Sequence, residues 1–334
     1  MHYRFILLLL CLSTAGAAQD AILSQFYAAP LRLNPALTGI STAPRAMVNY
    51  RSQHTAYPGA YTTLAASVEA PLERTPSSFG LRLLTDRQLE GLYTNSEVAL
   101  TYSYEVRVSE ELFARLGLGA GFLTTRVDFG GLRFGDAITA GNTTGGGTQE
   151  QLVSASKTSF DFAAGILVYY NIFYFGTTVE HLNRPDESLV ELNENLYAGR
   201  PQRVNLHGGA QIPVKRFSNR RRPVYVAPNF LFAQQAAFRQ LNLGTYLGYG
   251  DYAIGGWYRH AFGNADAVIL ALNFRHDVLR VGLSYDSVLS NLRFVPGGLG
   301  PTFEVSMGVD FGASKKLQRR RFRERYRDCF RMFQ

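Results

Sequence analysis

Apolar and polar residues alternate with a period of two over most of the chain between residues 46 and 311, and this alternation constrains the fold more than any other feature. In the segment 97–106, apolar or aromatic side chains occupy every second position, beginning at Val98. The segments 279–286 and 303–311 have the same pattern. Alternation of this kind is typical of β-strands with one apolar face, whereas an amphipathic helix repeats every 3.6 residues.

The same pattern, followed along the chain, predicts an all-β protein with about fourteen antiparallel strands. The even number suits a closed transmembrane β-barrel. The expected strands are 46–53, 60–69, 78–86, 93–106, 112–125, 158–170, 172–181, 203–212, 223–232, 239–249, 252–260, 267–275, 279–287 and 302–311.

Two soluble folds compete with this interpretation, a large sandwich and a closed barrel with a packed interior. The lengths of the connections favour a membrane barrel. The tight connections follow even-numbered strands, and the long connections follow odd-numbered strands. Outer-membrane barrels have short periplasmic turns and long extracellular loops, so this parity predicts that both termini are periplasmic. The tight connections are 107–111, 170–171, 250–251 and 276–278, and the long ones are 126–157, 182–202 and 288–301.

A barrel in lipid must close, because no backbone N–H or C=O group can remain unpaired in hydrocarbon. The alternation then directs residues such as Val98, Leu283 and Val305 toward lipid. Charged residues of both signs fall on the inner face, which predicts a wet lumen with ion pairs between its walls. The inward set is Arg51, Arg82, Arg115, Arg259, Arg280, Glu69, Glu97, Glu105, Asp161, Glu180, Asp286, Glu304 and Asp310.

Aromatic residues flank the tight connections, as in the belts where membrane proteins meet the lipid–water interface. They are Tyr102, Tyr104, Tyr169, Phe173, Tyr249, Tyr252 and Phe274.

One stretch offers an alternative to strands. Residues 162–179 contain no charged side chain, and such a run is long enough for a transmembrane helix. Its Gly, Asn, aromatic and β-branched residues suit a hairpin better. Asp161 and Glu180 also continue the inward face of the two strands, so we predict a hairpin.

The two ends of the chain differ from the body in composition. Residues 1–18 have the charged start, apolar run and small residues of a secretory signal peptide. The segment 19–45 contains too much proline for a strand, the barrel is expected at 46–312, and 313–334 form a basic tail. Nine of the 34 Lys and Arg residues lie in that tail, and the body between the two ends has 24 basic and 24 acidic residues. This neutrality argues against a nucleic-acid-binding surface.

The basic tail could form an amphipathic helix on the periplasmic side, where its partner would be an acidic protein surface or the headgroups of the inner leaflet. A disordered basic extension is the alternative. Cys329 would be the only thiol of the processed chain, so no internal disulfide is possible. The tail residues chosen as contact candidates are Arg320, Arg321, Phe322, Tyr326, Cys329 and Phe330.

No motif in the sequence indicates catalysis or a cofactor. The histidines after the signal peptide lie on separate predicted strands and loops, without metal-ligand spacing. The glycine-rich stretch 139–147 is not followed by a helix pattern, so it does not resemble a phosphate-binding loop and is either a surface contact loop or a solvated linker. We therefore expect no enzyme activity, no cofactor and no metal.

Several segments resemble one known family. Residues 24–39 read Ser-Gln-Phe-Tyr-Ala-Ala-Pro-Leu-Arg-Leu-Asn-Pro-Ala-Leu-Thr-Gly and are followed by Asn49-Tyr50-Arg51-Ser52-Gln53. This block is similar to the opening of the PorP/SprF family, which are outer-membrane proteins of the type IX secretion and gliding machinery of Bacteroidetes. The segments 67–72, 175–185 and 279–286 also resemble that family, although His54 stands where its members usually have Trp.

The resemblance implies a non-enzymatic outer-membrane protein that assists the secretion or surface retention of proteins with a C-terminal signal domain, such as large adhesins. Its partners would be secretion components and these secreted proteins, and the segment 19–45 would either plug the lumen or meet a periplasmic partner. A transporter for hydrophobic small molecules is the alternative, against which the inward charges argue. The motif residues that become contact candidates are Gln25, Phe26, Tyr27, Pro30, Asn34, Pro35, Gly39, Arg51 and Gln53.

Overall fold

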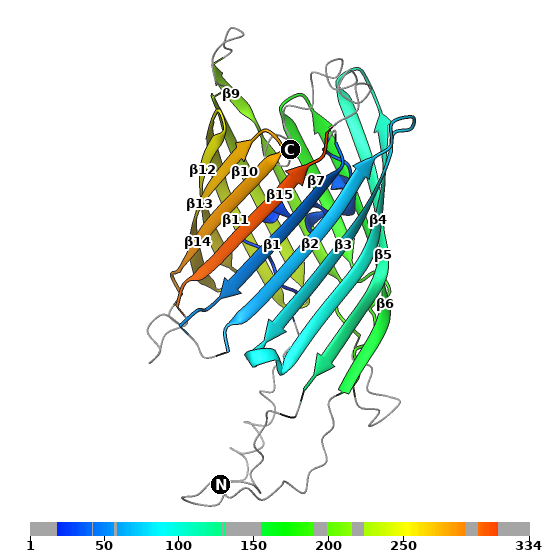
Figure 1. Cartoon of the computed structure of the whole chain (residues 1–334), viewed down its shortest axis with the longest axis vertical. Helices are drawn as coiled ribbons and strands as arrows, with labels where there is room; N and C mark the ends of the chain where they lie inside the picture. Colours follow the sequence, from blue (N-terminus) through cyan, green and yellow to red (C-terminus); the bar gives the residue numbers. More distant parts are fainter. Residues whose placement is uncertain are drawn as a thin grey trace, which may run out of the picture.

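A computed structural model of the chain shows a single closed β-barrel (Figure 1). It describes residues 19–312, apart from 42, 57–58, 129, 131–154, 190–198, 216–223 and 291–299. The sheet consists of fifteen segments, and two of them, β8 and β9, are parts of one strand interrupted at Gln211. The barrel therefore has fourteen antiparallel strands, and the prediction of an all-β fourteen-stranded barrel is confirmed.

The strand bounds lie within a few residues of those expected from the alternation. The strands are β1 (Arg45–Gln53), β2 (Tyr61–Pro71), β3 (Ser77–Gln88), β4 (Tyr93–Arg107), β5 (Leu112–Val127), β6 (Ala155–Tyr170), β7 (Phe173–Glu180), β8 (Arg203–Ala210), β9 (Ile212–Lys215), β10 (Val224–Gln235), β11 (Phe238–Tyr249), β12 (Tyr252–Ala261), β13 (Asn264–His276), β14 (Leu279–Val288) and β15 (Thr302–Asp310).

The first and last strands close the cylinder. Arg45 of β1 lies opposite Asp310 of β15, and the pairing continues to Ser52 opposite Phe303. Pairing of β10 with β11 completes the ring on the other side. We call the end at which β1 begins and β15 finishes the tail end, and the opposite end the loop end.

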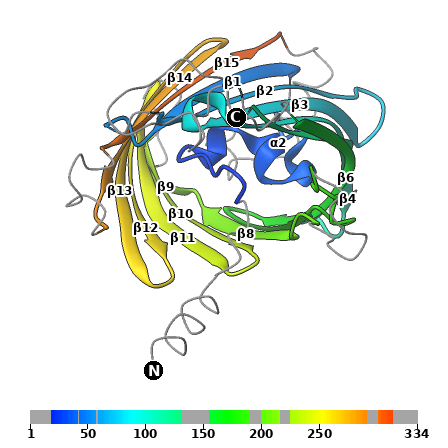
Figure 2. The ribbon, with the colours of Figure 1, turned by 90° about the horizontal axis from the view of Figure 1, so that it is seen from below.

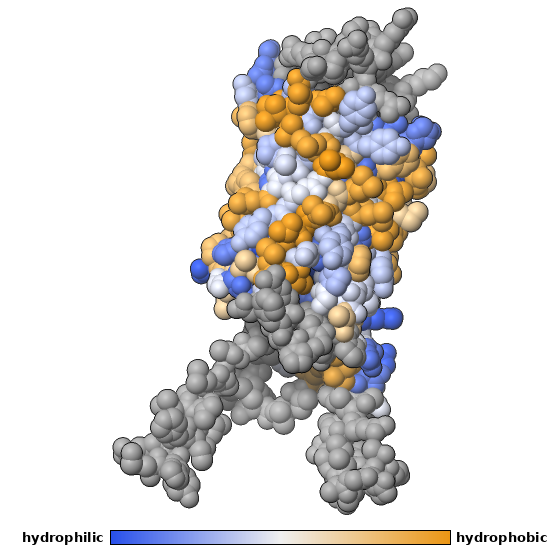
Figure 3. Space-filling view, turned by 90° about the vertical axis from the view of Figure 1, so that its left-hand side faces the viewer, coloured by the Kyte–Doolittle hydropathy of each residue, from blue (hydrophilic) through white to orange (hydrophobic). Residues whose placement is uncertain are grey.

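The predicted faces are confirmed. Val98, Leu283 and Val305 are 48%, 47% and 39% exposed on the outside. Glu97, Asp286 and Glu304, which alternate with them, are buried inside the barrel. Figure 3 shows apolar side chains spread over one outer face of the cylinder. This outer surface has the character that hydrocarbon requires.

The predicted parity of the connections is only partly correct. Two further two-residue turns lie at the loop end, Ala236–Ala237 between β10 and β11 and Phe262–Gly263 between β12 and β13. With β8 and β9 counted as one strand, these turns follow the ninth and eleventh strands, which are odd-numbered. The strands on either side extend further than their alternation suggested, which leaves two residues for each turn. The three long connections do lie at the loop end, but short turns occur at both ends.

The uncharged stretch 162–179 forms part of the β6–β7 hairpin, as predicted. Tyr170 pairs with Phe173 across a two-residue turn, in which Asn171 has a φ of 51°. Within the described residues, no helix is long and apolar enough to cross a membrane.

One aromatic prediction is wrong. Tyr169 is 2% exposed and faces the lumen, where its ring stacks on Phe113 with centroids 5.2 Å apart. Its hydroxyl donates to Glu105 at 2.7 Å. The neighbouring Tyr170 is 48% exposed and occupies the outer position instead, because adjacent strand residues point to opposite faces.

The segment before β1 lies inside the barrel (Figure 2). It contains three short helical pieces, η1 (Phe26–Ala28), α2 (Pro30–Leu33) and η2 (Pro35–Leu37). Nearly every described residue from Asp20 to Ala43 is buried. We refer to residues 20–41 as the plug. A lumen filled in this way differs from the wet lumen that the inward charges suggested.

The plug runs from one end of the barrel to the other. Asp20 contacts His181 and Gln235 at the loop end, whereas Gly39 contacts Glu69 near the tail end, where β1 begins. The prediction that both termini are on one side therefore fails for the described chain, because Asp20 and Gly312 lie at opposite ends. The reason is that the residues between Asp20 and β1 traverse the lumen.

Candidate functional site

The best-defined polar site of the described chain is the contact between the plug and the inner wall. Prolines and an asparagine shape the plug locally. Pro30 and Pro35 each stand at the first position of a short helical piece, where a missing N–H costs nothing. Between them, Asn34 caps the second piece by accepting a hydrogen bond from Ala36 N at 2.8 Å.

Asn34 also ties the plug to the wall. Its side-chain nitrogen donates to the carbonyl oxygens of Ile166 on β6 and Thr177 on β7, at 3.1 and 3.2 Å. A Cβ on Gly165 would lie 2.0 Å from the Asn34 oxygen, so glycine at this position allows the close approach. The Asn-Pro pair of the sequence motif is therefore a wall contact.

At the loop end, the plug is held by Asp20. Its carboxylate lies 2.8 Å from Arg200 Nη2 and 2.7 Å from His181 Nε2. Arg203 and Arg32 are 3.4 and 3.6 Å away. Burial acts to raise the pKa of Asp20, but these cations outweigh it and hold that pKa well below its ordinary value.

Asp20 belongs to a larger buried network, which we call the lumen ion cluster. It joins charged side chains of the plug, β3, β4, β6, β7, β8 and the connection after β7. Arg32 lies 2.6 Å from Glu180, and Arg82 lies 2.6 Å from Glu97. Its cations are Arg32, Arg82, Arg200, Arg203 and His181, and its carboxylates are Asp20, Glu97, Asp161, Glu180 and Glu187.

His181 completes the charge balance of this cluster. Burial disfavours its protonation, but Asp20 and Asp161, whose oxygens lie 2.7 and 3.0 Å from its ring nitrogens, raise its pKa to about 9. A protonated His181 makes five cations against five carboxylates. Such a network is costly to disrupt, because removing one partner leaves a buried charge uncompensated.

The opposite side of the lumen fixes the plug differently. The backbone N–H groups of Ser24 and Gln25 donate to the two oxygens of Glu304, at 2.7 and 3.0 Å. Ser24 Oγ donates to Asp286, which also pairs with Arg259 at 2.9 Å. Two carboxylates on β14 and β15 thus hold the plug through hydrogen bonds.

Aromatic packing fills the lumen next to β11 and β12. The Tyr27 ring stacks on Trp257 with centroids 5.9 Å apart and meets Tyr246 edge-on at 4.8 Å. Both wall residues are at most 3% exposed. The inner wall therefore presents an apolar patch on β11 and β12 besides its charged groups, and Tyr27 of the plug packs on this patch.

The motif residues chosen from the sequence, apart from Gln53, are brought together inside the barrel. Seven of them belong to the plug itself: Gln25, Phe26, Tyr27, Pro30, Asn34, Pro35 and Gly39. Arg51 points inward from β1 and donates to Ile22 O at 2.6 Å, and Gln53 lies at the loop end beside His54. The contacts shown by the structure are thus with the chain's own wall. The tail candidates Arg320, Arg321, Phe322, Tyr326, Cys329 and Phe330 lie outside the described residues.

Sequence reasoning missed Asp20, Arg32, His181, Arg200 and Trp257 as plug contacts. Arg32 stands within the quoted motif, between two leucines, which was a usable signal. Arg200 carries no local signal, since it follows a long connection. Among the described residues, no three His, Cys, Asp or Glu side chains are arranged to hold a metal ion.

The fold is similar to that of solved outer-membrane channels. The toluene transporter TbuX of Ralstonia pickettii aligns with a TM-score of 0.50 and 10% identity, covering 85% of this chain and 94% of that one. A FadL homologue of Pseudomonas aeruginosa aligns with a TM-score of 0.42 and 13% identity, covering 84% and 93%. The TodX monoaromatic hydrocarbon channel gives 0.45 and 11%, covering 85% and 94%. At these identities the likeness concerns the fold alone.

Sequence comparison identifies the family. No curated protein matches the chain. A sequence model of the type IX secretion system membrane protein PorP/SprF matches residues 15–309, which include the plug and all of the barrel except the last residue of β15. The chain therefore belongs to the PorP/SprF family of type IX secretion system membrane proteins.

Proposed function

We propose that this protein is a non-enzymatic outer-membrane component of the type IX secretion machinery, which assists the secretion or surface retention of proteins with a C-terminal signal domain. It would act by binding protein partners at its two ends, with the tail end facing the periplasm. The observation that carries the proposal is the plug, since a lumen crossed by a peptide held at both ends is suited to docking rather than to conduction.

Ionic contacts at the loop end couple the plug to the connection after β7. Arg200 belongs to that connection, and its side chain is 1% exposed. It lies 2.8 Å from Asp20 of the plug and 2.7 Å from Glu187 of the same connection. Glu187 accepts a hydrogen bond from Thr125 at the end of β5. A partner that moves this connection would therefore act directly on the plug.

Transport of hydrophobic small molecules is the second candidate. The fold likeness to TbuX and the aromatic side of the lumen, with Tyr246 and Trp257, favour it. Transport would require the plug to move, since Tyr27 covers these two rings.

Deletion of the gene separates the two functions. The proposal expects loss of surface adhesins carrying a C-terminal signal domain, with uptake of toluene-like solutes unchanged, and recovery on complementation with the full chain. Loss of solute uptake with normal surface adhesins would instead establish the transporter. A complementing variant with Arg126→Gln, which alters an exposed ion pair only, serves as the matched control.

A further inference from the structure

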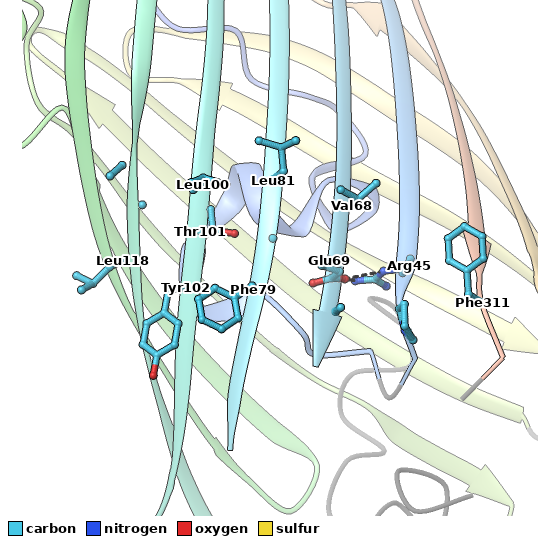
Figure 4. Close-up of a pocket in the computed structure, with 15 residues that line it drawn as sticks. Arg45, Val68, Glu69, Phe79, Leu81, Leu100, Thr101, Tyr102, Leu118 and Phe311 are labelled. Atoms are coloured by element: carbon cyan, nitrogen blue, oxygen red, sulfur yellow. Dashed lines mark hydrogen bonds and ion pairs between the residues drawn. The ribbon is translucent and has the colours of Figure 1, made fainter. Parts of the chain in front are cut away.

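An apolar groove lies on the outer wall of the barrel near the tail end (Figure 4). It spans β1 to β5 and has a volume of about 600 Å³. The side chains that face outward into it are almost entirely apolar. They include Val68, Phe79, Leu81, Leu100, Leu118 and Phe311.

The groove begins near the tail end of the barrel. Phe79 is the third residue of β3 and Val68 lies three residues before the end of β2, so both are close to the tail end. Leu118 is six residues into β5, about 20 Å along the strand. Because the strands of such barrels tilt by about 40°, the groove extends about 15 Å along the barrel axis.

The last described residues connect this groove to the tail. Phe311 follows β15, lines the groove and is 53% exposed. Gly312 is the next residue, and 22 residues of the sequence follow it. The described part of the chain thus ends at the edge of this apolar surface.

The sequence of the tail has the composition that such a surface needs. Phe322, Tyr326, Phe330 and Phe333 follow each other at spacings of four, four and three residues, which is one face of a helix. Nine Lys and Arg residues occupy other positions. A basic amphipathic helix lies at the membrane interface with its apolar face about 5–10 Å into the boundary.

We propose that the apolar face of residues 313–334 docks into this groove, with its basic face toward the headgroups and the periplasm. The dimensions agree. Cys329 is 18 residues beyond Phe311, which is about 27 Å in a helix. From β15 to β5 there are five strand spacings, about 24 Å. A tail crossing the groove therefore brings Cys329 close to Leu118.

Disulfide formation with the natural Cys329 tests this arrangement. Leu118→Cys provides the groove position. Leu270→Cys is the matched control, since Leu270 is also 60% exposed on the outer face and lies six residues from the tail end of its strand, β13. β13 is separated from β15 by one strand only. A tail that moves freely from the end of β15 would therefore meet Leu270→Cys more often than Leu118→Cys. The measurement is made on the full chain in membranes under mild oxidation.

The expected result is a disulfide between Leu118→Cys and Cys329, at least tenfold more abundant than with Leu270→Cys. Its yield should fall when Phe322→Glu alters the tail or when Ala120→Trp fills the groove. Equal crosslinking of both positions would show an undirected tail. Absence of crosslinking at Leu118→Cys and also at Val68→Cys would show that the tail does not occupy the groove and that lipid acyl chains cover it. Either result overturns the proposal.

Discussion

Replacing Arg32 with glutamine should release the plug from the wall. Arg32 lies 2.6 Å from Glu180 and 3.6 Å from both Glu97 and Asp20. The substitution leaves the lumen ion cluster with one excess buried negative charge. Losing one partner of a buried ion pair costs about 3–5 kcal/mol. Because Glu180 keeps Arg82 and Arg203, we take the lower value, about 3 kcal/mol.

This loss should appear as faster amide exchange in the plug. At about 1.4 kcal/mol per tenfold, a loss of about 3 kcal/mol raises the open population of residues 20–41 by about 10²-fold. Hydrogen–deuterium exchange of the protein in nanodiscs measures this directly, peptide by peptide. Exchange in the strands should stay as in the unchanged protein, because their backbone ladders do not depend on Arg32.

The matched control is Arg126→Gln. Arg126 pairs with Asp128 at 3.3 Å, but both side chains are about half exposed, so this pair contributes little. Exchange of the plug in Arg32→Gln within about fivefold of that in Arg126→Gln would refute the reasoning, since it would show that the cluster adjusts without its central cation.

Three further outcomes are expected. His181 has a raised pKa, so the stability it contributes is complete below about pH 6.5 and is lost as pH rises through about 9. Over this range the free energy of opening the plug, obtained from amide exchange corrected for intrinsic rates, should fall by up to about 3 kcal/mol. The substitution His181→Gln should remove this pH dependence. A Cβ on Gly117 would lie 2.1 Å from Ala36 N, whereas one on Gly256 meets no atom within 4 Å; Gly117→Leu should unseat the plug, measured as increased conductance in planar bilayers, and Gly256→Leu should not. An epitope placed before Asp20 should bind antibody on intact cells, whereas one placed after Gly312 should require permeabilisation, and the reverse pattern would contradict the outward direction of the loop end.

The sequence alone predicts the barrel well because its signal is local. Val98 and Glu97 differ in chemistry at adjacent positions, and an antiparallel strand converts that difference directly into lipid-facing and lumen-facing sides. The same rule explains why the hairpin around Asn171 could be chosen over a helix. Turn lengths were harder, since the strands ending at Gln235 and Ala261 extend beyond their clear alternation.

The site could be predicted only in part. The sequence motif identifies the residues from Gln25 to Gly39, but it does not predict their contacts, because each contact is made with a distant segment. Ser24 bonds to Glu304, 280 positions away, and Arg32 bonds to Glu180, 148 positions away. No periodicity encodes such pairs. Tyr169 is a second example. Its assignment to the aromatic belt required its side chain to face outward, and the register of the strand directs it into the lumen instead.

The pairing of β1 with β15 has a consequence for the order of assembly. The cylinder cannot close until its final strand has been made, although the residues it encloses are the first of the described chain. Until then, the carboxylates of Glu304 and Asp286 that bind Ser24 and Gln25 are not in position. Folding that depends on such remote contacts is slow. An unclosed intermediate would thus lack the contacts that hold its N-terminal segment, and the plug would take its final position only when the last strand pairs with the first.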